Sequence, residues 1–344
     1  MPRKKRNRPN IYDIATEAGV SISMVSRVVN GSGPVAEAKR KHVMAVLKRH
    51  DYQPSAAARS LARRDTNVIG LVIGASGAEY TQLFANRVLE GISACCRQVN
   101  RNVLLLWADR ETDPAELIQD VGASVDGLIL LDMRYDPGLT AALKEAGLSA
   151  VLVNEPSPCG DEASVLMDNR QGGRLAADYL ISCGHRRIGL ITGDLRLHIG
   201  RDRYEGAVAA LNEAGLPCRT DWVTDARFRP KTARQAVREL FANPAGERPT
   251  ALFVASDLMA FAVLDELRSL GLNVPGDVSV VGFDNSLIAP LASPPLTTIQ
   301  QPLVAMGKRA AELLDEVIRD PEAKQTVTLP LSLCERRSVR QLDS

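Results

Sequence analysis

Apolar residues near the N-terminus recur every three or four positions, which is the spacing of helices with one buried face. Three short helices are predicted between residues 11 and 52, and Gly19 ends the first because glycine tolerates a left-handed backbone. The second ends in the stretch 30–34, where Pro34 cannot continue a helix, and the third runs from about 36 to 50. The periodic positions are Ile11, Ile14, Ala15, Ala18, Val25, Val28, Val29, Val43, Val46 and Leu47.

The pattern changes after Pro54, which ends the helical unit. Residues 55–64 are alanine-rich and prone to form a helix, but they are too few to bury an apolar face alone. We therefore expect a helical head over 1–53, a hinge helix or linker over 54–65, and a body over 66–344.

In the body, short apolar runs alternate with amphipathic helical segments, which predicts an α/β fold with doubly wound parallel sheets. The runs are 68–73, 103–107, 127–131, 150–153, 188–192, 251–255 and 278–283. Two series of such strands predict two subdomains with a ligand cleft between the carboxyl ends of their strands. We expect one subdomain to comprise roughly 66–165 plus 297–325, and the other 166–296 plus 326–344.

The formal net charge of +1 conceals a steep asymmetry along the chain. Residues 1–64 carry fourteen Lys and Arg against four Asp and Glu, a net +10, and the remainder carries −9. A basic head on an acidic body indicates a module that binds a polyanion such as DNA, because Lys and Arg that neutralise phosphates release condensed counterions. The simpler alternative is a solvated basic face.

Cysteine and hydropathy patterns narrow the class of protein further. The six cysteines include no C-x-x-C pair and have no histidine cluster near them, so we expect reduced thiols, no metal and no cofactor. No apolar export segment follows the basic start, and no run of about 20 apolar residues occurs. We expect a cytoplasmic, nucleoid-associated protein without a membrane partner.

Residues 11–31 have the form of a helix-turn-helix, with Ala15 allowing close packing, Gly19 in the turn and Val25 in the core. The second helix then presents outward residues at its N-terminal end, the part that enters a major groove. These are Ile22, Ser23, Ser26 and Arg27, with Ser21 as the helix cap. Arg27 can pair with guanine, and Ile22 and Met24 can contact thymine methyl groups. Arg27 as a plain surface cation remains the alternative.

The run Ile11-Tyr12-Asp13-Ile14-Ala15, the Ala18-Gly19-Val20-Ser21 turn and Val25-Ser26-Arg27-Val28, followed by the 54–61 hinge, closely resemble the LacI/GalR family. The resemblance implies a head on operator DNA, a hinge helix, and a periplasmic-binding-protein-like body. The DNA-binding positions that it implies are Tyr12, Ser21, Ile22, Ser23, Met24, Ser26, Arg27, Asn30, Ser55, Ala58 and Leu61. Leu61 would wedge into a minor-groove step and kink the DNA, or else simply pack between helices.

The same resemblance covers four body motifs, at 167–173, 184–188, Arg203 to Gly206 and 280–284. The effector-binding positions that it implies are Phe84, Asn154, Arg203, Phe228, Ser256, Asp257 and Asp284. An Arg and an Asp facing one cleft suit the hydroxyl groups of a sugar. Two segments depart from the family: Ser256 stands where Asn often precedes the Asp, and the loop 75–84 lacks Asn-Pro-Phe-Phe. Asp168 and Asp257 could instead cap helices.

These features together predict a transcriptional regulator that acts as a repressor, binds a pseudo-palindromic operator as a homodimer, and responds to a sugar or sugar derivative. No leucine heptads for a coiled-coil tetramer are visible. A purine-type corepressor sensor and a sugar-binding protein that does not bind DNA stay open as alternatives. An enzyme is disfavoured, because no G-x-G-x-x-G follows the first strand and no Ser/His/Asp set is apparent.

Overall fold

A computed structural model describes residues 10–30, 33–50, 52, 65–74, 78–109, 111–133, 136–216, 218–242, 244 and 247–342. Its N-terminal head consists of α1 (Ile11–Glu17), α2 (Ile22–Asn30) and α3 (Glu37–Arg49). The predicted apolar periodicity becomes one small core, in which Ile14, Val25 and Val43 are fully buried. Gly19 has a φ of +60° between α1 and α2, as the predicted turn requires. Residues 53–64, which include nearly all of the expected hinge, lie outside the described residues.

The first lobe of the body is a parallel six-stranded sheet in the order β11-β5-β4-β3-β1-β2. Its strands are β1 (Val68–Gly74), β2 (Asn102–Ala108), β3 (Gly127–Leu131), β4 (Ser149–Val153), β5 (Ala163–Met167) and β11 (Thr326–Leu329). Four helices flank it: α5 (Ala78–Gln98), α6 (Pro114–Gly122), α7 (Pro137–Ala146) and α12 (Leu303–Arg319). Helix α5 packs against α12, and α6 packs against α7. Apolar clusters lie on both faces of this sheet.

The second lobe repeats this plan in the order β12-β10-β9-β8-β6-β7, with only the β10–β12 pair antiparallel among these described strands. The strands are β6 (Ile188–Thr192), β7 (Val223–Asp225), β8 (Ala251–Val254), β9 (Ser279–Asp284), β10 (Thr297–Gln300) and β12 (Ser332–Cys334). The helices are α8 (Asn169–Ser182), α9 (His198–Glu213), α10 (Pro230–Ala242) and α11 (Asp257–Ser269), plus short 3₁₀ turns at Thr220–Trp222 and Ala289–Leu291. The predicted pair of doubly wound parallel sheets is therefore confirmed.

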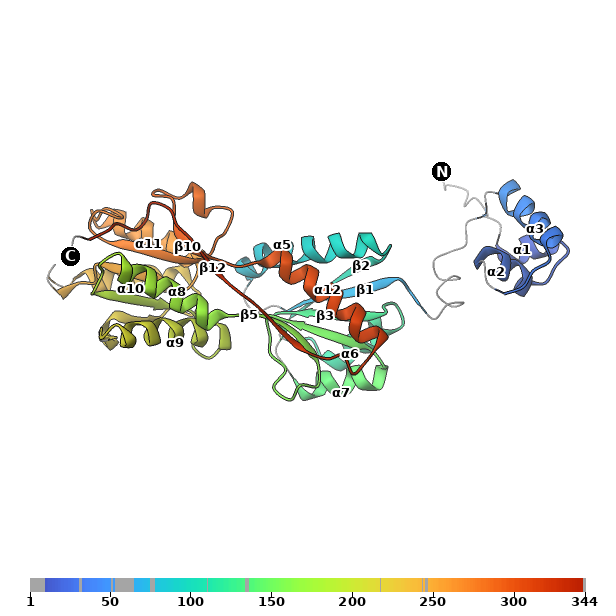
Figure 1. The fold of residues 1–344 in the computed structure, drawn as a ribbon, viewed down its shortest axis with the longest axis horizontal. Coiled ribbons are helices and arrows are strands. Elements are labelled where there is room, and N and C mark those ends of the chain that lie inside the picture. The colour runs from blue at the N-terminus through green and yellow to red at the C-terminus, as the bar shows by residue number, and fades with distance from the viewer. Residues whose placement is uncertain are drawn as a thin grey trace.

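The chain passes between the lobes at three places, visible at the centre of Figure 1: from β5 to α8, from β10 to α12, and from β11 to β12. Two of the expected subdomain boundaries were misplaced. β10 belongs to the second sheet, where Thr297 pairs with Val281, although 297–325 was expected in the first lobe. β11 belongs to the first sheet, where Thr326 pairs with Ser164, although 326–344 was expected in the second.

No helix in the described part of the chain is both long and apolar enough to cross a membrane.

Candidate DNA-binding surface and effector site

The second head helix is anchored at its N-terminus by Ser21, as expected. The backbone N–H of Met24 donates to Ser21 Oγ at 3.3 Å, and Ser21 Oγ lies 2.9 Å from Ser23 Oγ. Val25 and Val28 turn into the core, while Ser23 and Arg27 are exposed. A capped helix with its N-terminal half exposed can enter a major groove.

The other predicted DNA contacts lie around this face. Tyr12 on α1 is 65% exposed and Ile22 is 40% exposed, so two large apolar side chains face solvent beside the α2 surface. Met24 and Ser26 are half-buried, and Asn30 is the last residue of α2. Ser55, Ala58 and Leu61 lie outside the described residues.

α3 adds exposed cations that were not among the predicted contacts. Lys39, Lys41 and Lys48 are all exposed on this helix. Lysines at such positions suit phosphate contacts, which position a protein on DNA without reading its sequence. The signal available in the sequence was the basic density of 39–49 itself, since the family motif of α2 carries no information on phosphate contacts.

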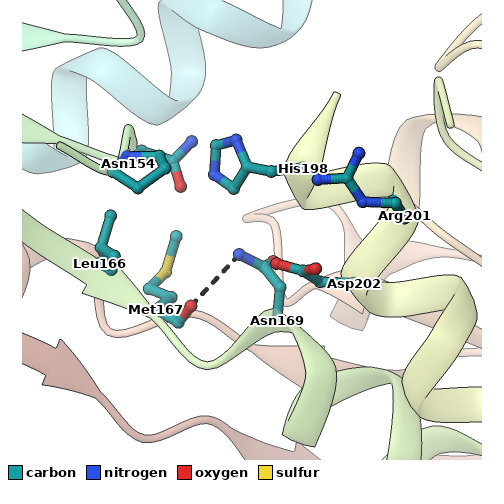
Figure 2. A pocket seen from close by; sticks show the side chains of 8 residues that line it. Asn154, Leu166, Met167, Asn169, His198, Arg201 and Asp202 are labelled. Atoms are coloured by element: carbon teal, nitrogen blue, oxygen red, sulfur yellow. Dashed lines mark hydrogen bonds between the residues drawn. The ribbon is translucent and has the colours of Figure 1, made fainter. Parts of the chain in front are cut away.

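A cavity of about 270 Å³ lies between the two lobes of the body. Its lining residues are Asn154, Pro156, Leu166, Met167, Asn169, His198, Arg201 and Asp202. Figure 2 shows that the first lobe contributes the ends of β4 and β5, and the second lobe the first turns of α8 and α9. The cavity therefore occupies the cleft that the parallel sheets predicted, beside the carboxyl ends of their strands.

Asn154 is the one predicted effector residue that lines this cavity among the described residues. It follows β4 with a left-handed φ of +63° and is 6% exposed. Its Nδ2 donates to Asp132 Oδ1 at 2.7 Å, and its Oδ1 has no hydrogen-bond partner among the described residues. Burial raises the pKa of Asp132 to about 6, so at neutral pH this carboxylate is an acceptor.

Arg203 and Asp284 are brought together, as predicted, but behind the cavity wall. The Arg203 side chain is 2% exposed and lies with its Nη1 3.7 Å from Asp284 Oδ1. Its Nε donates to Asn169 Oδ1 at 2.9 Å, and its Nη1 donates to the Ala255 carbonyl at 2.7 Å. Its guanidinium also stacks 3.7 Å from the centre of the Phe283 ring. Arg203 therefore orients Asn169, which does line the cavity.

Ser256 and Asp257 serve the interior of the second lobe. Ser256 caps α11, with its Oγ accepting from the Met259 N–H at 3.3 Å. Asp257 is fully buried, and its carboxylate accepts from Thr298 Oγ1 at 2.6 Å and from the Ser286 N–H at 2.7 Å. Burial raises the pKa of Asp257 to about 6. Asp257 thus joins α11 to the segments around β9 and β10, while the capping that was considered for it is done by Ser256.

The two predicted aromatic contacts lie away from the cavity lining. Phe84 is 3% exposed and belongs to the apolar core of the first lobe, because it faces inward from α5. Phe228 is half-buried with a φ of +56°, and its ring centre lies 5.8 Å from the Arg203 guanidinium. A side chain at Gly193 would collide with this ring, at 2.1 Å from Cζ, so Gly193 provides the space for Phe228.

Sequence reasoning missed three lining residues on α9: His198, Arg201 and Asp202. The Nδ1 atom of His198 lies 3.6 Å from Glu155 Oε2 of the first lobe, and burial lowers the pKa of His198 to about 4. Spacing from the predicted Arg203 could not have found them, because they lie five, two and one positions before it, and none of these separations puts two residues on one helix face.

Neither a metal centre nor a disulfide is seen within the ranges that the structure describes. No group of three His, Cys, Asp or Glu residues is placed there to hold a metal ion. All six cysteines are free thiols.

Comparison with known families matches residues 10–55 to the bacterial regulatory proteins of the lacI family, and residues 177–339 to a periplasmic binding protein-like domain. The chain is 37% identical over 334 residues to the HTH-type transcriptional repressor PurR of Yersinia pestis (strain Pestoides F), across 96% of either chain.

Two solved structures extend the likeness to the whole fold. The lac repressor dimer bound to operator and the anti-inducer ONPF has a TM-score of 0.80 at 25% identity, over 97% of this chain and 100% of that one. The complex of the transcriptional regulator CelR with cellobiose has a TM-score of 0.71 at 33% identity, over 96% of this chain and 100% of that one. The resemblance drawn from the sequence is confirmed. The chain belongs to the lacI family of bacterial regulatory proteins and is a DNA-binding transcriptional regulator controlled by a small-molecule effector.

Proposed function

We propose that the chain binds a pseudo-palindromic operator as a homodimer, through α2 of each head and a hinge at 54–65, and that a saccharide in the interlobe cleft changes its operator affinity. The observation that carries the DNA-binding part is the exposed N-terminal face of the Ser21-capped α2, on a head that together with the hinge (residues 1–64) has a net charge of +10. Within that face we assign base contact to Arg27, with Ile22 and Met24 beside it. Two-fold protein symmetry then requires a two-fold operator.

The cleft supports a saccharide better than a purine. Asn154, Asn169 and Asp202 give its wall amide and carboxylate groups, which suit hydroxyls. A purine gains much of its affinity from ring stacking, yet the lining contains no aromatic residue other than the His198 imidazole among the residues described. The likeness to a regulator described in complex with cellobiose points the same way.

Catalysis is not part of the proposal. The relative and the solved structures compared above are transcriptional regulators or repressors. Histidine is a common general acid or base in enzymes, but burial lowers the pKa of the lining residue His198 to about 4. We propose a cytoplasmic regulator that senses its effector by binding alone.

The test is to select binding sites from random duplex DNA and measure affinities by fluorescence anisotropy. Arg27→Ala should cost about 1–3 kcal/mol per half-site on the selected sequence and little on random DNA, because a base contact carries the sequence information. Lys41→Ala, which removes one exposed cation from α3, is the matched control. It should weaken binding to both DNAs equally, as the loss of a phosphate contact does.

Equal losses of Arg27→Ala on both DNAs would make Arg27 a phosphate contact. Selection of sites without two-fold symmetry, or sedimentation of the protein as a monomer at micromolar concentration, would contradict the dimer on a symmetric operator.

A further inference from the structure

Asn154, which lines the cavity, has a side-chain oxygen without a hydrogen-bond donor among the described residues. Asn154 is more than nine-tenths buried, and its Nδ2 faces the Asp132 carboxylate at 2.7 Å. A carboxylate can only accept, so this contact fixes which end of the amide is which. Asn154 Oδ1 then points the other way and has no partner among the described residues. A buried acceptor left unpaired costs free energy that a ligand hydroxyl would recover.

A second acceptor stands across the cavity on α9. Asp202 lies four residues after His198, so both side chains lie on the same face of the helix, as Figure 2 shows. The Asp202 side chain is half-buried, and it makes no hydrogen bond or ion pair with the described part of the chain. Burial raises the pKa of Asp202, and the neighbouring Arg201 opposes this rise. Asp202 is thus desolvated without a structural partner to account for its position.

The two acceptors come from different lobes. Asn154 follows β4 of the first lobe, and Asp202 belongs to α9 of the second. A ligand with hydroxyl donors at both ends would therefore join the lobes, whereas a phosphate or carboxylate group at either point would meet an acceptor and be repelled. Arg201 is the cation among the described lining residues, and its side chain is exposed, so solvent screens its charge.

From this geometry we infer that Asp202 is an effector-contacting residue: its carboxylate and Asn154 Oδ1 accept hydrogen bonds from two hydroxyls of an uncharged saccharide. The inference rests on the proposed saccharide site and adds its charge class and a residue that sets it. It selects neutral sugars against their phosphorylated and acidic counterparts.

The experiment begins with a thermal-shift screen of the full chain. The probes are D-glucose, D-galactose, D-ribose and cellobiose, together with glucose 6-phosphate, ribose 5-phosphate and glucuronate. At least one neutral probe should stabilise the protein and the anionic ones should not. Stabilisation by anionic probes only, or by none of the probes, would overturn the inference.

Calorimetry with the stabilising sugar then tests the residue. Asp202→Asn keeps the shape of the side chain but removes its charge, so affinity should fall about tenfold or more. Glu205→Gln is the matched control, because Glu205 lies on the same helix but pairs with Arg170 at 3.0 Å on the surface. It should change affinity less than about twofold. A tenfold loss of sugar affinity corresponds to about 1.36 kcal/mol of binding free energy.

Equal affinities of Asp202→Asn and wild type would overturn the assignment of Asp202. Neither variant should unfold at a lower temperature than wild type, and both should keep the wild-type operator affinity, so a loss of operator binding would mark a failure of the proposed function instead.

Discussion

Arg203 is a buried cation whose Nε donates to Asn169 Oδ1, so it holds one wall of the effector cleft in place without lining it. The motif around Arg203 correctly placed it beside Asp284, since both follow from local family patterns. It did not reveal that Arg203 is held inside the lobe by Asn169 and by the Ala255 carbonyl. These partners lie 34 and 52 residues away in the sequence. Such contacts depend on how α8, α9 and β8 pack, which periodicity does not specify. Phe84, on α5, packs into the apolar core of the first lobe, and its effector contact stays a prediction.

The buried carboxyl of Glu162 leads to a residue-scale prediction on pH. Glu162 is 7% exposed, and burial raises its pKa to about 7 from the ordinary 4.5. The folded state therefore holds the proton more tightly than the unfolded state, so stability is present at low pH and is lost as pH rises through about 7. Glu162→Gln should be more stable than wild type at pH 8, by about 1–2 kcal/mol after allowing for solvent screening.

The gain should grow between pH 4.5 and about 7 and then level off, as measured by urea unfolding at a series of pH values. Glu322→Gln, an exposed glutamate near the same strand edge, is the control and should show no such trend. A Glu162→Gln gain that is the same at pH 5 and pH 8 would mean that Glu162 is not the titrating group.

At the scale of elements, continuous apolar runs were the reliable signal. β3 is buried along its whole length, and its bounds were predicted without error. The strands β10 and β11 were missed because their threonines hide the pattern. Thr297 and Thr298 are fully buried, but the sequence of β10, with three polar residues in four, is not typical of a core strand. Thr297 Oγ1 accepts from the Arg336 N–H at 2.9 Å and Thr298 Oγ1 donates to Asp257 Oδ1 at 2.6 Å, and only the fold brings these partners near.

The cap of α2 gives a prediction at this scale. Ser21 Oγ accepts the Met24 N–H at 3.3 Å, and losing a serine cap typically costs about 1 kcal/mol of helix stability. In the full chain, Ser21→Ala should speed hydrogen exchange of the α2 amides several-fold. Lys41→Ala is the comparison, because Lys41 is exposed on α3 and takes no part in the cap of α2. Equal exchange rates in Ser21→Ala and wild type would show that the head is stabilised by its core alone.

At the scale of the whole molecule, the sequence predicted two sheets, a cleft and a basic head, but not where the chain changes lobes. The passages from β10 to α12 and from β11 to β12 both lie at the centre of Figure 1, and no change of composition marks them in the sequence. Because α8 and α9 of one lobe and β4 and β5 of the other both line the cavity, a ligand there contacts both lobes at once. Any change it makes to operator affinity must be matched by an equal effect of operator on its own binding.

The central claim, a basic head that binds DNA for an otherwise acidic body, is tested most directly by the salt dependence of operator affinity. Fluorescence anisotropy titrations at a series of salt concentrations give the slope of log K against log salt. A dimer in which residues 1–64 of each chain carry a net +10 and contact many phosphates should give a slope on the order of −6 or steeper. A slope near zero would contradict the account.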